Sequence, residues 1–206
     1  MMHMNNNETG RKIIVALEIS VDGFIEGPNG EMDWAMMEDE ESWKYMFEML
    51  SHIDTFILGR KMYPGYEQYW LAVLADPTKI LPFSGRAASK NEIAYARLAD
   101  SRHHIVLSST LDKVAWKTTQ IVRDVEDIRK MKQQPGKDMY VVGGATLVSS
   151  LMNLGFIDEL QLLVNPLILG GGMALFKDVK ERHTLKLAGV KPLKSGKVGL
   201  AYNVQH

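Results

Sequence analysis

Cysteine is absent from this chain of 206 residues. Disulfide bonds, thiolate nucleophiles and cysteine-ligated metal sites are therefore excluded, and the reducing cytoplasm is the expected location. Long hydrophobic runs are missing too, because no apolar segment approaches the roughly 20 residues that a membrane-spanning helix needs. Residues 1–10 are polar and rich in asparagine, so we expect a disordered tail there and not a signal peptide.

The chain also has no excess of charge of either sign. Its 24 Lys and Arg residues nearly balance 25 Asp and Glu residues, and no basic cluster is interleaved with aromatic residues, which argues against a nucleic-acid partner. Among the six histidines, His103 and His104 are adjacent in an expected strand and would point to opposite faces. We therefore expect no metal site, and a small molecule as the partner.

Apolar runs alternate with helical patterns along most of the chain. Strands are expected at residues 12–19, 55–58, 104–107, 120–122 and 139–142, with helices at 36–50, 60–70, 91–99, 125–131 and after residue 144. Residues 71–90 show no clear period and contain Pro77, Pro82 and Gly85, which favours a long loop that acts as a lid or is a variable insertion.

Three further strands, at residues 159–164, 185–190 and 198–204, follow without intervening helices. This order predicts a single α/β domain over residues 11–206, with a mostly parallel central sheet flanked by helices and a C-terminal antiparallel hairpin at one edge.

The segment Met139–Leu147, MYVVGGATL, joins an apolar run to two glycines and then to a helical pattern. A strand that turns through glycine into a helix directs unpaired backbone N–H groups and the positive end of the helix dipole to one point. Because Gly143 and Gly144 lack a Cβ atom, an anion can approach the main chain closely. The turn predicts a phosphate site, although glycine pairs are also common in turns that only redirect the chain.

Two other strand ends have a similar character. Arg60 and Lys61 follow Gly59, and cations at the start of a helix oppose its dipole unless an anion lies between them. Ser108 and Ser109 follow another strand and offer hydroxyl donors, as an ordinary polar turn also would. Carboxyl ends of parallel strands meet at one edge of an open α/β sheet, so these turns together could hold a phosphorylated dinucleotide. No Gly-x-Gly-x-x-Gly motif follows the first strand, which excludes the Rossmann fingerprint.

These motifs and their order resemble the dihydrofolate-reductase-like superfamily. The resemblance is closer to the reductase domain of bifunctional riboflavin-biosynthesis deaminase/reductases and its stand-alone bacterial relatives, and it covers residues 11–204. It rests on the motifs Ser20–Ile25, Gly59–Tyr63, Leu107–Ser109, Val142–Ala145 and Asp158–Leu160, and on the segment Pro166–Gly172.

The resemblance implies an NADPH-dependent reductase of a small heterocyclic or carbonyl/imine substrate, similar to 5-amino-6-(5-phosphoribosylamino)uracil reductase and taking part in riboflavin biosynthesis. By the same resemblance, the chain forms a homodimer through its apolar C-terminal strands. The Gly143–Gly144 peptide is expected to be cis.

The resemblance further implies where NADPH binds. Arg60, Ser108 and Ser109 would hold the adenosine 2′-phosphate, the turn at residues 143–147 would receive the pyrophosphate, and the nicotinamide would lie near Ala16. The full expected set of cofactor-binding residues is Ala16, Val21, Asp22, Gly59, Arg60, Lys61, Met62, Ser108, Ser109, Val142, Gly143, Gly144, Ala145, Thr146 and Leu147.

Two carboxylates are candidates for the catalytic acid. Folate reductases of this superfamily use a buried carboxylate on the first helix after a tryptophan, and Asp39 stands in a comparable place after Trp34. Asp39 also belongs to an acidic first helical turn that the dipole alone would explain. Asp22 is the second candidate and could equally be a turn former.

Other functions suit the same residues. The chain could be a non-catalytic nucleotide-binding regulatory or stress protein that retains the pocket, a structural dimer with a vestigial pocket, or a true dihydrofolate reductase. NADPH binding without reduction of any aldehyde, pterin or aminouracil would favour the first, and absence of NADPH binding would favour the second.

Overall fold

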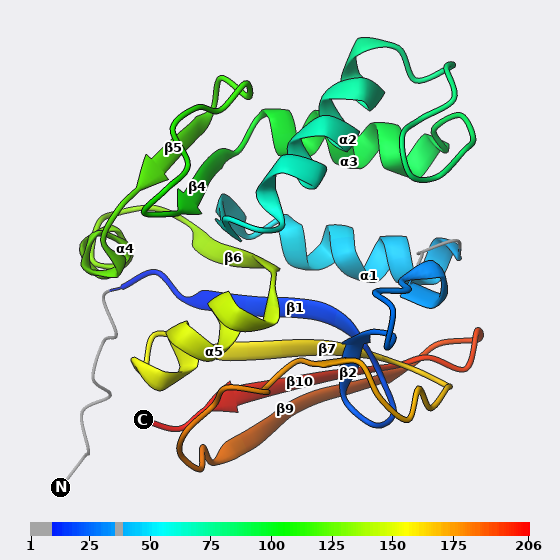
Figure 1. The fold of residues 1–206 in the computed structure, drawn as a ribbon. Helices are drawn as coiled ribbons and strands as arrows, with labels where there is room; N and C mark the ends of the chain where they lie inside the picture. Colours follow the sequence, from blue (N-terminus) through cyan, green and yellow to red (C-terminus); the bar gives the residue numbers. More distant parts are fainter. Residues whose placement is uncertain (1–9, 36–38) are drawn as a thin grey trace, which may run out of the picture.

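An eight-stranded sheet organises the computed structural model, which describes residues 10–35 and 39–206. Its strand order is β5-β4-β3-β6-β1-β7-β10-β9 (Figure 1). The strands are β1 (Ile13–Ser20), β3 (Ile53–Gly59), β4 (His103–Leu107), β5 (Thr119–Val122), β6 (Asp138–Gly143), β7 (Glu159–Asn165), β9 (Leu185–Pro192) and β10 (Val198–Val204). Neighbours from β5 to β7 pair in parallel, whereas β10 runs antiparallel to both β7 and β9. The expected α/β class and the hairpin at one edge are confirmed.

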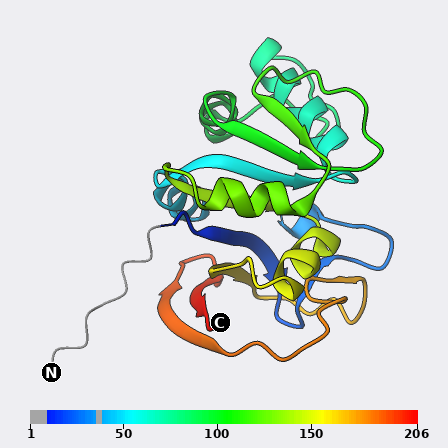
Figure 2. The ribbon, with the colours of Figure 1, turned by 90° about the vertical axis from the view of Figure 1, so that its left-hand side faces the viewer.

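Helices cover both faces of this sheet (Figure 2). They are α1 (Glu40–Leu50), α2 (Tyr63–Ala75), α3 (Lys90–Asp100), α4 (Val125–Lys132) and α5 (Ala145–Asn153). Alternate residues of a strand point to opposite faces. Accordingly, Ile13 and Val15 of β1 pack in the core beneath α4 and α5, while Ile14 packs in the core beneath α1, α2 and α3.

Three short elements complete the chain: β2 (Phe24–Glu26) pairs with β8 (Met173–Ala174), and a single 3-10 turn, η1, spans Asp33–Ala35. Two expected boundaries differ from the structure. Helix α1 begins at Glu40, so part of the helix expected at residues 36–50 falls on residues 36–38, outside the described residues. Helix α2 continues to Ala75, which shortens the expected loop to residues 76–89. Residues 1–9 of the tail expected at residues 1–10 also lie outside the described residues.

Within the described part of the chain, no helix is long and apolar enough to cross a bilayer. The same residues contain no group of three or more His, Cys, Asp or Glu side chains placed to hold a metal ion.

Candidate active site

A cavity of about 1210 Å³ opens at the carboxyl ends of the parallel strands. Its wall includes residues 16–18 of β1, the end of β3 with the turn 59–62, the end of β6 with the start of α5, and one side of α1. The loop between α2 and α3 adds Phe83, Ser84 and Arg86. This is the edge at which open α/β sheets bind ligands.

The glycine turn between β6 and α5 forms one end of this wall. Gly143 has φ +147°, and a Cβ there would lie 3.2 Å from both Leu17 Cδ2 and Met62 Sδ, so the close packing needs glycine. Gly144 has φ +95° and caps α5 without a side-chain hydrogen bond, and a Cβ there would meet no atom of the described residues within 4 Å. The start of α5 therefore presents its backbone N–H groups to open space, as an anion site requires.

All five residues of the predicted pyrophosphate turn, Gly143 to Leu147, line the cavity, and so does Val142 before them. Every described peptide bond is trans, so the cis peptide expected between Gly143 and Gly144 is wrong.

Arg60 and Lys61 also line the cavity, together with Gly59, Met62 and Ala16. Both cations are exposed, and within residues 10–35 and 39–206 neither side chain forms an ion pair or hydrogen bond. They do not lie in the first turn of a helix as predicted, because α2 begins at Tyr63 and Met62 is its cap. The two cations therefore remain available to an anion that enters the cavity near α5.

Ser108 and Ser109 do not contribute to the cavity wall. The Ser108 hydroxyl accepts hydrogen bonds from the backbone N–H groups of Thr110 and Leu111, at 3.2 and 2.9 Å. Only Leu107, the last residue of β4, reaches the cavity from this strand. The third predicted anion turn is thus an ST-type turn in this structure, and a contact of Ser109 with NADPH stays a prediction.

Val21 and Asp22 likewise lie off the cavity wall. The Asp22 carboxylate accepts hydrogen bonds from Ser20 Oγ and from the backbone N–H groups of Leu169 and Gly170, at 2.6, 3.1 and 2.7 Å. The bond from Ser20, the largest cause, lowers the pKa of Asp22. Asp22 therefore fastens the turn after β1 to the loop after β7, and nothing in this geometry directs it at a ligand.

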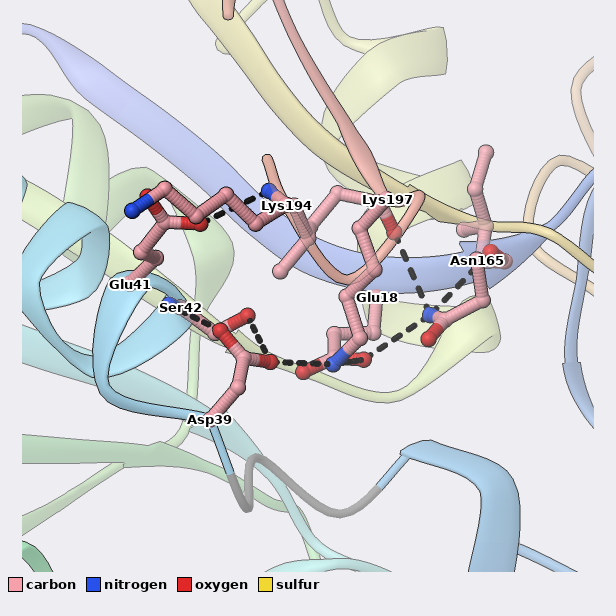
Figure 3. A network of polar contacts seen from close by, with 9 residues as sticks. Glu18, Asp39, Glu41, Ser42, Asn165, Lys194 and Lys197 are labelled. Atoms are coloured by element: carbon pink, nitrogen blue, oxygen red, sulfur yellow. Dashed lines mark hydrogen bonds and ion pairs between the residues drawn. The ribbon is translucent and has the colours of Figure 1, made fainter. Parts of the chain in front are cut away.

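Asp39 is the N-cap of α1. Its carboxylate accepts hydrogen bonds from Ser42 N and Ser42 Oγ, both at 2.7 Å, and lies 3.4 Å from Lys197 Nζ (Figure 3). Partial burial opposes the charged form, but the Ser42 bonds and Lys197 together lower the pKa of Asp39. Asp39 is not part of the cavity wall, so its expected role as the catalytic acid has no geometric support here.

Glu18 is a site residue that the sequence did not single out. Asn165 Nδ2 and Lys197 Nζ both donate to its Oε2, at 2.8 and 3.2 Å, and Lys197 thereby joins Glu18 to Asp39 (Figure 3). The other oxygen, Oε1, is buried without a hydrogen-bond partner among the described residues. Burial raises the pKa of Glu18, although Asn165 and Lys197 act in the opposite direction.

A sequence signal for Glu18 does exist. Glu18 is the single charged residue between Ile13 and Ile19, in a run that reads as a buried strand. A carboxylate is almost never buried without a partner or a function. The partners, Asn165 and Lys197, are about 150 and 180 positions away, so only the fold reveals that one oxygen stays free.

Comparisons with known proteins agree with this geometry. The fold is that of the dihydrofolate-reductase-like proteins: dihydrofolate reductase from Enterococcus faecalis, complexed with NADP(H) and RAB-propyl, superposes with a TM-score of 0.60 at 14% identity, covering 95% of this chain and 97% of that one. Within that fold, the chain belongs to the RibD C-terminal domain family, whose model matches residues 11–198. The family resemblance inferred from the motifs is confirmed.

Two further proteins are similar to this chain. It is similar to the uncharacterized protein YyaP of Bacillus subtilis, at 34% identity over 201 residues, which covers 97% of this chain and 98% of YyaP. A diaminohydroxyphosphoribosylaminopyrimidine deaminase/5-amino-6-(5-phosphoribosylamino)uracil reductase from Thermotoga maritima matches with a TM-score of 0.61 and 15% identity. That match covers 96% of this chain and 58% of the longer Thermotoga protein.

Proposed function

We propose that this protein is an NADPH-dependent reductase that adds hydride to a C=N or C=O bond of a small heterocyclic substrate. The observation that carries the proposal is the pairing of two features on one cavity wall. These are the open N-terminus of α5 at Gly144 and the two cations Arg60 and Lys61, which have no partner among the described residues. Both attract phosphate groups, the first through backbone N–H groups and the second through charge.

The residues present fit a phosphorylated dinucleotide. Backbone N–H groups at the start of α5 would bind the pyrophosphate, because Gly144 leaves them uncovered. The Arg60 guanidinium would pair with the 2′-phosphate. When bound, the dinucleotide supplies the hydride, and the protein supplies position, charge and exclusion of water. The cavity exceeds the roughly 300–1,000 Å³ of most ligand sites, which leaves room for a substrate beside the cofactor.

A substrate similar to 5-amino-6-(5-phosphoribosylamino)uracil, and hence a place in riboflavin biosynthesis, follows from the family and from the Thermotoga relative's name. Lys177 on the cavity wall is the cation that would meet a ribose phosphate. The direct test is NADPH oxidation, followed at 340 nm, with this aminouracil and with dihydrofolate. Oxidation with dihydrofolate alone would instead identify a dihydrofolate reductase, and NADPH binding with no oxidation would favour a nucleotide-binding regulatory protein.

The cofactor assignment is tested with Arg60→Ala. Loss of a charge-assisted phosphate contact should weaken NADPH binding by about 10- to 100-fold. NADH, which lacks the 2′-phosphate, should bind as before. Trp43 and Trp70 line the cavity, so quenching of tryptophan fluorescence reports binding. Arg97→Ala, an exposed arginine on α3, is the matched control. If Arg60→Ala lost the same affinity for NADPH and for NADH, Arg60 would not contact the 2′-phosphate.

A further inference from the structure

Glu18 differs from every other carboxyl group on the cavity wall. Its side chain is only 6% exposed. Glu92 is also buried, but it already accepts hydrogen bonds from three neighbouring groups. Asp33 is exposed and Glu26 is half-buried. Among the described residues of the wall, Glu18 alone combines burial with a carboxyl oxygen that has no partner.

The two oxygens of Glu18 have different surroundings. Oε2 accepts from both Asn165 and Lys197, and Oε1 accepts from no described residue. A proton on Oε2 would face two donors, so the neutral carboxyl carries its proton on Oε1. A carboxyl in that state needs an acceptor, and the described residues provide none. Because Glu18 lines the cavity, the acceptor would be a group on a ligand that packs against Glu18 there.

Two charged groups face this carboxyl. The Lys197 ammonium on the hairpin side lies 3.2 Å away and favours the carboxylate, while Asp39 at the start of α1 repels it. Lys197 is shared between the two carboxylates, because its Nζ also lies 3.4 Å from Asp39 Oδ2. The arrangement balances charge around Glu18 while burial holds its pKa above the usual range. A carboxyl group with a raised pKa is suited to donating a proton.

We propose that Glu18 is the proton donor of the reduction, acting through Oε1 on the nitrogen or oxygen of the substrate's C=N or C=O group. This inference rests on the proposed function. In the step, the Glu18 Oε1–H bond breaks and an N–H or O–H bond forms on the substrate. The hydride of the new C–H bond would come from the bound reduced dinucleotide, which would be oxidised in the same step. Lys197 and Asn165 hold the resulting carboxylate until solvent returns the proton.

The protonation state is measured without any substrate. In protein with ¹³C-labelled glutamate, one carboxyl resonance should be missing in Glu18→Gln and should titrate with a midpoint above 4.5, the ordinary value. Lys197→Met removes the ammonium that favours the carboxylate, so this midpoint should move further upward. A midpoint at or below 4.5 in the native protein would overturn the proposal.

The catalytic role is measured with 5-amino-6-(5-phosphoribosylamino)uracil and NADPH. Glu18→Gln should lower kcat by about 100-fold or more, with the Kd for NADPH within about twofold of the native value. The native rate should fall as pH rises through the Glu18 midpoint, because the donor must be protonated, and the variant should lose this dependence. Glu181→Gln, at an exposed residue that does not line the cavity, is the control. A variant with native kcat and pH profile would exclude Glu18 as the donor.

Failure of the proposed function can be told apart from failure of this inference. If the native protein does not oxidise NADPH with this aminouracil, 5,6-diaminouracil is added to the NADP⁺-bound, labelled protein. A shift of the Glu18 resonance would show that Glu18 contacts the ligand. The proposed reductase function would then be wrong, but the place of Glu18 in the site would be supported. If diaminouracil binds and the Glu18 resonance does not change, Glu18 does not contact the ligand, and this inference is wrong whether or not the protein is a reductase.

Discussion

His104 is a fully buried imidazole between aromatic rings of the core beneath α2. Its ring centroid lies 4.5 Å from that of Trp116 and 5.2 Å from that of Phe56. The ring nitrogens lie within hydrogen-bonding distance of two hydroxyl groups, those of Tyr66 at 3.4 Å and Thr118 at 3.3 Å. Burial is the main cause that lowers the pKa of His104 from 6.5 to about 4.

This pKa makes the protein sensitive to acid. The unfolded chain binds the proton near pH 6.5 and the folded chain only near pH 4, so stability is lost as pH falls through this window. Between pH 7.5 and pH 5 the contribution of His104 should fall by about 2 kcal/mol. Urea unfolding at both pH values should show a smaller loss for His104→Gln than for the native protein, and an unchanged loss for exposed His52→Gln. Equal losses in all three proteins would contradict the assignment.

Asp39 and Glu18, two acidic residues of the network in Figure 3, show what single residues reveal in a sequence. The sequence pattern predicts Asp39 inside the acidic first turn of a helix at residues 36–50, whereas the structure places it just before α1, as the N-cap. Glu18 interrupts an apolar strand, which predicts burial but not a partner. The ion pair between Glu18 and Lys197 depends on how the hairpin β9–β10 is placed relative to β1, and no local sequence pattern predicts that placement.

At the scale of elements, α3 begins with a complete capping box. Ser89 Oγ accepts from Glu92 N at 3.2 Å, and Glu92 Oε2 accepts from Ser89 N at 2.7 Å. Glu92 also accepts from Arg86 and Tyr69. Although burial opposes the charged form, these bonds lower the pKa of Glu92 to about 2. The cap thus ties the start of α3 to α2 and to the loop between them.

Removing either residue of this capping box should destabilise the fold, and removing Glu92 should do so more than removing Ser89. Ser89→Ala should lower the free energy of unfolding by about 1 kcal/mol, the usual effect of losing an N-cap. Glu92→Gln should cost more, about 2 kcal/mol, because charge-assisted bonds are lost as well. Since the folded pKa is depressed, the Glu92 contribution is complete above pH 4.5 and disappears as pH falls toward 2. Urea unfolding measures both, with Ser101→Ala at the other end of α3 as the control. Equal effects for Ser89→Ala and Ser101→Ala would contradict the capping role.

Two elements show the limits of pattern reading. Residues 70–75 of α2, WLAVLA, are apolar at every position, so no helical period is visible although the helix continues. Ser108 and Ser109 follow a strand end at the ligand-binding edge, as predicted, but the Ser108 hydroxyl bonds its own turn and the chain leads away. That ligands bind at the carboxyl ends of the strands predicts the edge of the sheet at which the site lies, but not the direction in which each loop leaves its strand.

At the scale of the molecule, the sequence predicted the sheet better than the site. The α/β class and the mostly parallel sheet could be predicted because apolar runs alternate with helical patterns along the chain. The edge hairpin could be predicted because the last strands follow one another without helices. Two of the three predicted anion turns meet in one cavity, because the neighbours β3 and β6 end side by side. The cavity itself also needs α1 and the loop before α3, whose position depends on contacts far apart in sequence.

The edge strand β9 has an unusual surface. Its neighbour β10 occupies one side, and the other side pairs with no strand of the described residues. Three of its large apolar side chains are exposed: Leu185, Leu187 and Val190. A bulge opposite Ala201 and Tyr202 shifts the register so that all three stand on one face, opposite alternate residues of β10, namely Val204, Tyr202 and Leu200.

We propose that a second copy of this chain covers this edge. An edge strand can pair antiparallel with its own copy across a twofold axis, and a net charge of −1 opposes such pairing little. Analytical ultracentrifugation should show a dimer, and Leu187→Gln should raise its dissociation constant about tenfold or more, since a buried leucine contributes about 1.5–3 kcal/mol. Lys186→Gln, on the opposite face, should leave it unchanged. A native chain that stays monomeric at all concentrations would refute this interface, whereas equal effects of both variants would place the contact elsewhere on β9.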